Sequence, residues 1–226
     1  MSSTIKSNRI KGIMFIIASA LGFAMMSAFV KLAGDLPSFQ KVFFRNLVSA
    51  IIAFWLIIKH KGSLTGKKEN LKVLLYRSIF GTLGVIFNYY AIDKLMLSDA
   101  NMLNKMSPFL VVIFCAIALK EKINAKQIGA IIIAFIGALF IIKPTFSVEV
   151  IPYLGGIAGA VFAAMAYTCL RVLGDREDYY TIVFFFSVFS LVTVGPIAFA
   201  VYEPMTLMQL IYLLLGGVFA SLGQFG

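Results

Sequence analysis

Long apolar segments, separated by short polar stretches, dominate the sequence. Each has about the 20 or so residues that an α-helix needs to cross a membrane, and none alternates like a membrane β-strand. The pattern predicts an all-α polytopic membrane protein with about eight spans in this chain. The predicted spans are Ile10–Leu32, Phe39–Ile58, Leu71–Ile92, Leu97–Leu119, Lys126–Ile142, Pro152–Val172, Tyr179–Val201 and Thr206–Gly226.

The composition excludes other classes of protein. Of the 226 residues, 61% are hydrophobic and 13% are charged, which is more apolar surface than one soluble core can hide. A disordered chain would be polar, and a disulfide scaffold would need more than Cys115 and Cys169. The sequence has no hydrolase, zinc-enzyme or phosphate-loop motif. We therefore expect no enzyme, no catalytic residue, no metal and no cofactor.

The net charge of +10 is explained by membrane topology and does not require a nucleic-acid partner. If the N-terminus is cytoplasmic, 13 basic residues flank the spans on the inner side and 4 on the outer side. Basic residues favour the cytoplasmic side of a membrane protein. The charge pattern thus predicts a cytoplasmic N-terminus in a protein whose surroundings are the lipid bilayer.

The sequence also contains an internal repeat. Residues 24–35 align with 164–175, 42–44 with 183–185, and 80–84 with 219–223, in the same order and at nearly constant spacing. The repeat unit is five helices, and an odd number of spans inverts the second copy in the membrane. We predict a first repeat over residues 1–145 and a second over 146–226 that stops in its third helix, so that the complete protein has ten helices.

Several motifs resemble those of a known family. Residues Glu121–Gly129 and Ala134–Leu139 resemble the stretch that joins the fourth and fifth helices of EamA-type transporters, in the drug/metabolite transporter superfamily. Arg45, Pro108 and the pair Gly81 and Gly84 also match that family. The resemblance covers the whole chain. It implies two inverted five-helix repeats around a central cavity, with both termini in the cytoplasm, and transport of small metabolites, often as export.

Polar residues inside the spans are candidates for substrate binding. Arg45 and Lys105 lie at similar depths, about 9 and 12 Å from the outer ends of their helices, and Lys105 shares one helix face with Asn101, Asn104 and Pro108. Pro108 frees the backbone carbonyl of Asn104, which could then face a cavity. The candidate site comprises Arg45, Asn88, Asn101, Asn104, Lys105 and Tyr167 for substrate, and Gly81, Gly84 and Pro108 for gating or cavity backbone.

A structural alternative exists for each basic residue. Arg45 and Lys105 could extend their long side chains to the outer interface. For Arg77, which lies about six residues from the inner end of its span, we expect extension to the inner interface, although it shares a face with Gly81, Gly84 and Asn88.

The leading hypothesis is a secondary transporter, an exporter or exchanger, that moves a small anionic or zwitterionic metabolite by alternating access. All ten acidic residues lie at span ends or in loops, which disfavours a multidrug or cation exporter because such a protein needs a buried carboxylate. A membrane-embedded enzyme acting on lipid-linked substrates is a further alternative. We expect the protein to reside in the bacterial cytoplasmic (inner) membrane and to function as a monomer, with a dimer as the alternative.

Overall fold

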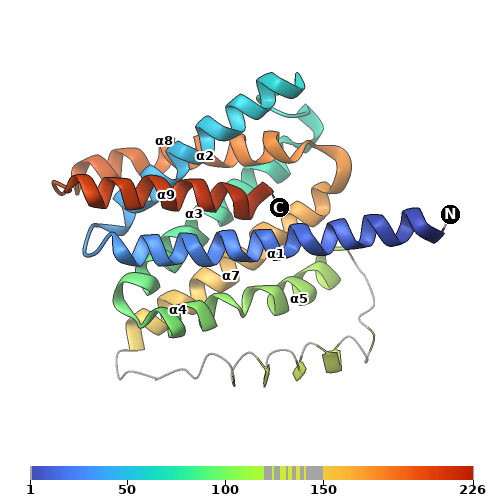
Figure 1. Cartoon of the computed structure of the whole chain (residues 1–226), viewed down its shortest axis with the longest axis horizontal. Helices are drawn as coiled ribbons and strands as arrows, with labels where there is room; N and C mark the ends of the chain where they lie inside the picture. The colour runs from blue at the N-terminus through green and yellow to red at the C-terminus, as the bar shows by residue number, and fades with distance from the viewer. Residues whose placement is uncertain are drawn as a thin grey trace.

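The computed structural model describes residues 2–119, 124, 128–130, 132, 133, 136, 137, 140 and 150–225, with side chains from Gly12 onward. The regular secondary structure of these residues is helical throughout, and the long helices lie roughly side by side along the long axis of the molecule (Figure 1). The elements are α1 (Ser2–Leu32), α2 (Ser38–His60), η1 (Lys68–Asn70), α3 (Leu71–Lys94), α4 (Leu97–Asn104), α5 (Ser107–Leu119), α7 (Val150–Leu173), η2 (Gly174–Arg176), α8 (Tyr179–Ala200) and α9 (Leu207–Phe225).

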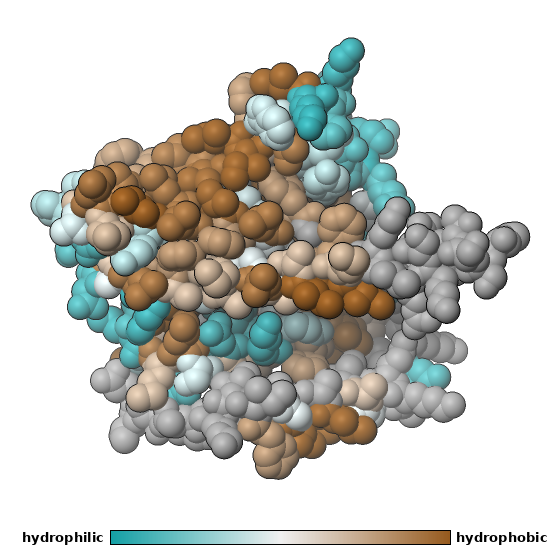
Figure 2. Space-filling model, in the orientation of Figure 1, coloured by the Kyte–Doolittle hydropathy of each residue, from teal (hydrophilic) through white to brown (hydrophobic). Residues whose placement is uncertain are grey.

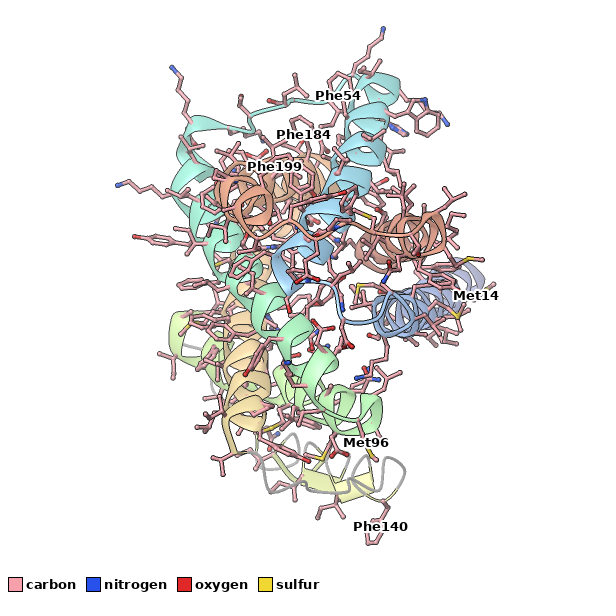
Figure 3. The ribbon with its side chains drawn as sticks, turned by 90° about the vertical axis from the view of Figure 1, so that its left-hand side faces the viewer. Met14, Phe54, Met96, Phe140, Phe184 and Phe199 are labelled. Carbon is pink, nitrogen blue, oxygen red and sulfur yellow. The ribbon has the colours of Figure 1, made fainter. Side chains whose placement is uncertain are left out.

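Seven helical stretches in the described residues are long and apolar enough to cross a membrane. They coincide with seven of the predicted spans, while most of the predicted span Lys126–Ile142 lies outside the described residues. Apolar side chains cover much of the face seen in Figure 2. Met14, Met96 and Phe140, which are 64%, 63% and 76% exposed, project from the periphery of the molecule (Figure 3). Such a surface suits lipid and not water, so the chain is an integral membrane protein of the all-α class.

The fourth predicted span is divided. The sequence predicts one helix over Leu97–Leu119, but the structure has α4 and α5, with a break at Lys105 and Met106. Pro108 provides a physical reason, because a proline has no N–H to donate to the carbonyl four residues earlier, that of Asn104. The hydroxyl of Ser107 donates to this carbonyl instead, at 2.8 Å. The Asn104 carbonyl therefore has a local partner, in contrast to the free carbonyl that the sequence suggested.

The helices pack in a pattern that repeats. Helix α3 packs along α7 and α1 along α9, α2 contacts α8, and the remaining long-helix contacts include α2 with α9 and α3 with α8. If α1 is exchanged with α7, α2 with α8 and α3 with α9, this set of contacts maps onto itself. The described helices thus behave as two sets of three that contact each other in the same way.

Glycines also lie at close contacts between these helices. A Cβ built on Gly84 of α3 would lie 3.0 Å from the backbone nitrogen of Ala163 in α7, and one on Gly223 of α9 would lie 2.9 Å from the ring of Phe23 in α1. The sequence repeat aligns Gly84 with Gly223, and Phe23 with Ala163. Glycines that the repeat aligns therefore lie at both helix crossings, against backbone at one and against an aromatic ring at the other.

Two ends of the bundle can be distinguished. The α1–α2 and α8–α9 connections lie at one end, with the last turn of α3, and we call it the Asp93 end (left in Figure 1). The α2–α3 and α7–α8 connections lie at the other end, which we call the Glu177 end. Under the charge pattern of the sequence, the Asp93 end would face outward and the Glu177 end the cytoplasm.

Candidate functional site

Two arginines from different helices meet one aromatic ring inside the bundle. Arg45 of α2 and Arg77 of α3 place their Cζ atoms 5.8 and 4.3 Å from the ring centroid of Phe186 in α8. The two residues are only 5% and 7% exposed, and Phe186 is 1% exposed. Both cations are therefore held within the packed helices, where the face of an aromatic ring attracts them.

Neither guanidinium group is fully hydrogen-bonded. The Nε atoms of Arg45 and Arg77 are buried and have no hydrogen-bond partner among the described residues. Arg45 donates one long bond, at 3.4 Å, to the side-chain oxygen of its neighbour Asn46. The aromatic ring offsets only part of the cost of taking these charges out of water. The site thus presents unused donors and positive charge to any anion that reaches it.

The burial of Arg77 corrects one prediction from the sequence. The expectation that Arg77 extends to the inner interface is wrong, because its side chain lies against Phe186 and is almost fully buried. Gly81, one turn further along α3, makes this possible. A Cβ on Gly81 would collide with Nη1 of Arg77 and lie 2.9 Å from the Phe186 ring. Gly81 therefore provides the space that the guanidinium group occupies.

A polar layer crosses the bundle next to Arg45, and the site predicted from the sequence does not contain it. Asn46 of α2 donates through Nδ2 to the hydroxyl of Ser190 in α8 at 2.9 Å, and the hydroxyls of Ser49 in α2 and Ser221 in α9 lie 3.0 Å apart. All four residues are buried. The repeat offers one signal that could have found the layer, since the alignment of residues 42–44 with 183–185, when extended, pairs Ser49 with Ser190.

Two further candidates lie where α3 crosses α7. Gly84 and Asn88 are on α3, and the backbone nitrogen of Asn88 would lie 3.0 Å from a Cβ on Gly159. Gly84 thus has a packing role at this crossing. Asn88 is half-buried. Tyr167 of α7 is 43% exposed.

The other predicted residues lie on α4 and at the break that follows it. Lys105 and Pro108 are exposed, and Asn101 and Asn104 are half-buried. Helix α4 packs mainly against α7 and α3. The side chain of Arg45, by contrast, lies against Phe186 of α8. The candidate residues therefore fall into two groups, one at Phe186 and one at the α4–α5 break.

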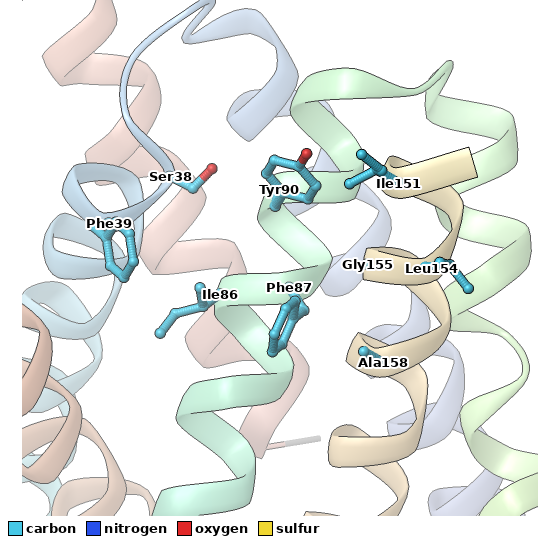
Figure 4. Close-up of a pocket in the computed structure, with 9 residues that line it drawn as sticks. All are labelled: Ser38, Phe39, Ile86, Phe87, Tyr90, Ile151, Leu154, Gly155 and Ala158. Atoms are coloured by element: carbon cyan, nitrogen blue, oxygen red, sulfur yellow. The ribbon is translucent and has the colours of Figure 1, made fainter. Parts of the chain in front are cut away.

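Cavities in the bundle lie nearer the Asp93 end. A pocket of about 530 Å³ is formed by α2, α3 and α7 and is lined mainly by apolar side chains, with the hydroxyl-bearing Ser38 and Tyr90 among them (Figure 4). A smaller, more polar pocket of about 270 Å³ includes Asp35, Asp93, Lys94 and Glu203. Neither is lined by a residue of the predicted site. The larger pocket is lined by Ser38, Phe39, Ile86, Phe87, Tyr90, Ile151, Leu154, Gly155 and Ala158.

Comparison with known proteins places the chain in a family. The sequence profile described as "EamA-like transporter family" matches residues 10–143. The "Pseudopaline exporter CntI" of Pseudomonas aeruginosa is 32% identical over 94% of this chain and 75% of its own length. The human "Solute carrier family 35 member G1" is 27% identical over 80% of this chain and 53% of its own length.

A crystal structure with 14% sequence identity covers 92% of this chain and 79% of its own, with a TM-score of 0.61. At that identity it shows a shared fold alone. The family match and the two named relatives indicate a transporter and not an enzyme, which removes the alternative of an enzyme on lipid-linked substrates. The chain belongs to the EamA-like transporter family, within the drug/metabolite transporter superfamily.

Proposed function

We propose that the protein is a secondary transporter, an exporter or exchanger, for a small anionic or zwitterionic metabolite. One observation carries this proposal: Arg45 and Arg77 are buried on the Phe186 ring with unused hydrogen-bond donors. A substrate carboxylate or phosphate would supply the missing acceptors through charge-assisted hydrogen bonds. Such an anion would also offset the desolvation of two positive charges.

A cation or multidrug exporter is the runner-up, and the same geometry disfavours it. A buried organic cation would be repelled by two guanidinium groups within about 10 Å of each other, as their distances to one ring imply. The acidic residues of the described chain lie at helix ends or in loops, and none of them belongs to the pair of arginines on Phe186, although Asp99 is buried in the first turn of α4. The named pseudopaline exporter among the relatives supports the exporter mode over uptake.

We propose that transport proceeds by alternating access between two inverted repeats, residues 1–145 and 146–226. The contacts that map onto themselves when α1, α2 and α3 are exchanged with α7, α8 and α9 support this organisation. Transporters built from inverted repeats bind substrate near the middle of the membrane and rock one repeat against the other. The polar layer of Asn46, Ser190, Ser49 and Ser221 lies between the two sets of helices and agrees with a site there.

The proposed site combines the two groups of residues. Arg45 and Arg77 form its cationic centre. Gly81 and Gly84, on the same helix as Arg77, contribute the backbone of α3 to the site. The amides and hydroxyl of Asn88, Asn101, Asn104 and Tyr167, with Lys105 and the Pro108 break, add polar contacts to the substrate. We place the protein in a bacterial cytoplasmic membrane, with its N-terminus in the cytoplasm, as a functional monomer with a dimer as the alternative.

Proteoliposomes containing the purified chain test the function. Saturable counterflow of one anionic or zwitterionic metabolite from a panel is the expected result. A steady ohmic current without saturation would instead indicate a channel. Counterflow should be lost in Arg45→Ala and reduced in Lys105→Ala. If both variants transport the substrate at the parent rate, the proposed anion site is wrong.

A further inference from the structure

The hydroxyl of Tyr89 is buried without a use in the packing of the bundle. Tyr89 of α3 is one of the largest fully buried side chains, and its hydroxyl has no hydrogen-bond partner among the described residues. Its ring belongs to a buried cluster that also contains Val42 of α2 and Val194 of α8. A buried hydroxyl normally has a partner, because removing it from water without one is costly. The Tyr89 hydroxyl is therefore a donor in search of an acceptor.

Tyr89 and Arg45 lie at similar depths in the bundle. Their helices are joined at the Asp93 end, where the hydroxyl of Ser38 donates to the Asp93 carboxylate at 2.7 Å and Lys41 forms an ion pair with it. Arg45 comes seven residues after Ser38 on α2, a rise of about 10 Å. Tyr89 comes four residues before Asp93 on α3, a rise of about 6 Å. The charge of Arg45 is accordingly within electrostatic reach of the Tyr89 hydroxyl.

Arg77 approaches the same region from the other end of α3. It lies twelve residues before Tyr89, about 18 Å along the helix axis. Its Nη1 atom lies beside Gly81, one turn nearer to Tyr89. Because the Cζ atoms of Arg77 and Arg45 lie 4.3 and 5.8 Å from one ring centroid, they are no more than about 10 Å apart. Unused donors therefore follow one another along the bundle, from Tyr89 through Arg45 to Arg77.

A second hydroxyl without a partner lies between the two ends of this row. Thr82 of α3 is 5% exposed, and its Oγ1 has no hydrogen-bond partner among the described residues. The hydroxyls of Ser78, Thr168 and Ser221, by contrast, each donate to the carbonyl four residues earlier in their own helix. Thr82 precedes Tyr89 by seven residues, so both lie on one face of α3. That face thus offers two hydroxyl donors that the helix itself does not use.

The two arginines also leave two positive charges to be neutralised. Neither forms an ion pair with a described residue, and the two cations repel each other. A ligand with a single negative charge would leave one buried cation unpaired, which is costly, whereas a ligand with two would pair both. Since the arginines come from different helices, each can bind a carboxylate of its own through parallel N–H donors. The charges therefore favour a ligand with two separated carboxylates.

We propose that Tyr89 is a substrate-binding residue and that the substrate is an elongated dianion, a dicarboxylate. One carboxylate lies between the guanidinium group of Arg45 and the hydroxyl of Tyr89. The other lies on Arg77, and Thr82 faces the stretch between the two. The inference rests on the anion site of the proposed function, and it narrows the substrate from any anion or zwitterion to an anion with two separated charges.

Stabilisation of the purified full chain by ligands in detergent tests this without a transport step. The midpoint of thermal unfolding is followed while succinate or glutarate is added, and the rise in the midpoint gives an apparent Kd. Butyrate and valerate have the same chain lengths but one carboxylate, and inorganic phosphate is a compact anion. We expect each dicarboxylate to bind about tenfold more tightly than its monocarboxylate partner, and more tightly than phosphate.

The variant Tyr89→Phe removes the hydroxyl and keeps the ring. Because the hydroxyl has no partner among the described residues, the variant without ligand should unfold at or above the midpoint of the parent. Its Kd for succinate and glutarate should rise about tenfold, since one hydrogen bond to a carboxylate is lost. Tyr90→Phe removes a hydroxyl from the next residue, which is half-buried, and should bind like the parent as the matched control. Arg77→Gln should abolish the preference for dicarboxylates.

Several results would overturn the inference. An unfolding midpoint of Tyr89→Phe well below that of the parent would mean that the hydroxyl has a structural partner. Parent-like binding of dicarboxylates by Tyr89→Phe would remove Tyr89 from the site. Equal affinity of the parent for dicarboxylates and monocarboxylates, or phosphate binding as tight as that of succinate, would exclude an elongated dianion.

Failure of the proposed function has a different signature. If none of these anions stabilises the parent, the anion site is wrong and the dicarboxylate with it. If the anions bind without the preference for dicarboxylates, the anion site stands and only the present inference fails. Binding with the expected preference, but without counterflow of any metabolite in proteoliposomes, would refute transport and leave the assignment of Tyr89 standing.

Discussion

Arg45 and Arg77 reach the same ring, that of Phe186, from two different helices, and the Cζ of Arg77 lies closer to it, at 4.3 Å against 5.8 Å. The sequence repeat aligns Arg45 with Phe186 itself, so this contact joins two equivalent positions of the second helix in each proposed repeat. A cation and an aromatic ring at equivalent positions make the centre of the bundle chemically asymmetric. We propose that this asymmetry gives the bundle a place to hold an anion.

Neutralising Arg77 should impair transport as strongly as neutralising Arg45. Each substitution removes charge-assisted hydrogen bonds between a guanidinium group and the substrate, which are worth about 1.5–3 kcal/mol. Arg77→Gln and Arg45→Gln should therefore each lower the transport rate at subsaturating substrate by about tenfold or more. Initial rates in proteoliposomes measure this. Lys72→Gln, an exposed charge on the same helix as Arg77, should transport like the parent. Normal transport by Arg77→Gln would remove that residue from the site.

A methyl group at Gly81 should act on the site through Arg77. The new Cβ would collide with the Arg77 guanidinium group and crowd the Phe186 ring, so the guanidinium must move away from its place. We expect Gly81→Ala to weaken substrate affinity several-fold, measured as a higher KM in counterflow. Gly12→Ala is the matched control, since a Cβ on Gly12 meets nothing within 4 Å. An unchanged KM in Gly81→Ala would mean that substrate binding does not depend on the Arg77 guanidinium group lying where the structure has it.

Larger side chains at the α3–α7 crossing should destabilise the fold. Cβ atoms on Gly84 and Gly159 would lie 3.0 Å from backbone nitrogens of the facing helix, and backbone cannot yield as a side chain can. Overpacking of this kind costs about 1–3 kcal/mol, so Gly84→Leu and Gly159→Leu should lower the midpoint of thermal unfolding in detergent. The same change at Gly12 should leave the midpoint near that of the parent. Equal midpoints for all three variants would contradict the close crossing.

Cross-linking the two proposed repeats at either end of the bundle should stop the transport cycle. With native cysteines replaced, a short bifunctional thiol reagent can join Thr181→Cys to Ser63→Cys at the Glu177 end, or Gln40→Cys to Glu203→Cys at the Asp93 end. Because each end must open once per cycle, either link should abolish counterflow, and cleavage of a reducible linker should restore it. Each single-cysteine variant treated in the same way is the control. Continued counterflow through a cross-linked end would show that this end does not open.

The sequence predicted the helices well because the membrane imposes a simple rule on them. A span must be long, apolar and hydrogen-bonded within itself, and seven of the predicted spans coincide with helices that could cross a membrane. The EamA resemblance was confirmed by the family profile over residues 10–143. The break at Lys105 and Met106 was missed because proline position alone does not say whether a helix bends or ends.

Depth along a helix was also readable from the sequence, but the direction of a side chain was not. Arg45 and Arg77 both lie several residues inside their spans. From the sequence, each side chain could extend to the membrane interface or stay inside the bundle. The deciding facts were the ring of Phe186, which lies 109 residues after Arg77 and 141 residues after Arg45 in the sequence, and the space beside Gly81. No local pattern contains that information.

What the sequence by itself determined is the class, seven of the spans and the positions of charge along them, because hydropathy, periodicity and charge are properties of single positions and short windows. Tertiary structure alone decided which charges are buried, which meet each other and which end of the bundle carries the Lys41–Asp93 pair. Those outcomes depend on helices that are far apart in the chain and come together only in the fold. The physical reason is that the free energy of a buried charge is set by its neighbours in space, and not by its neighbours in sequence.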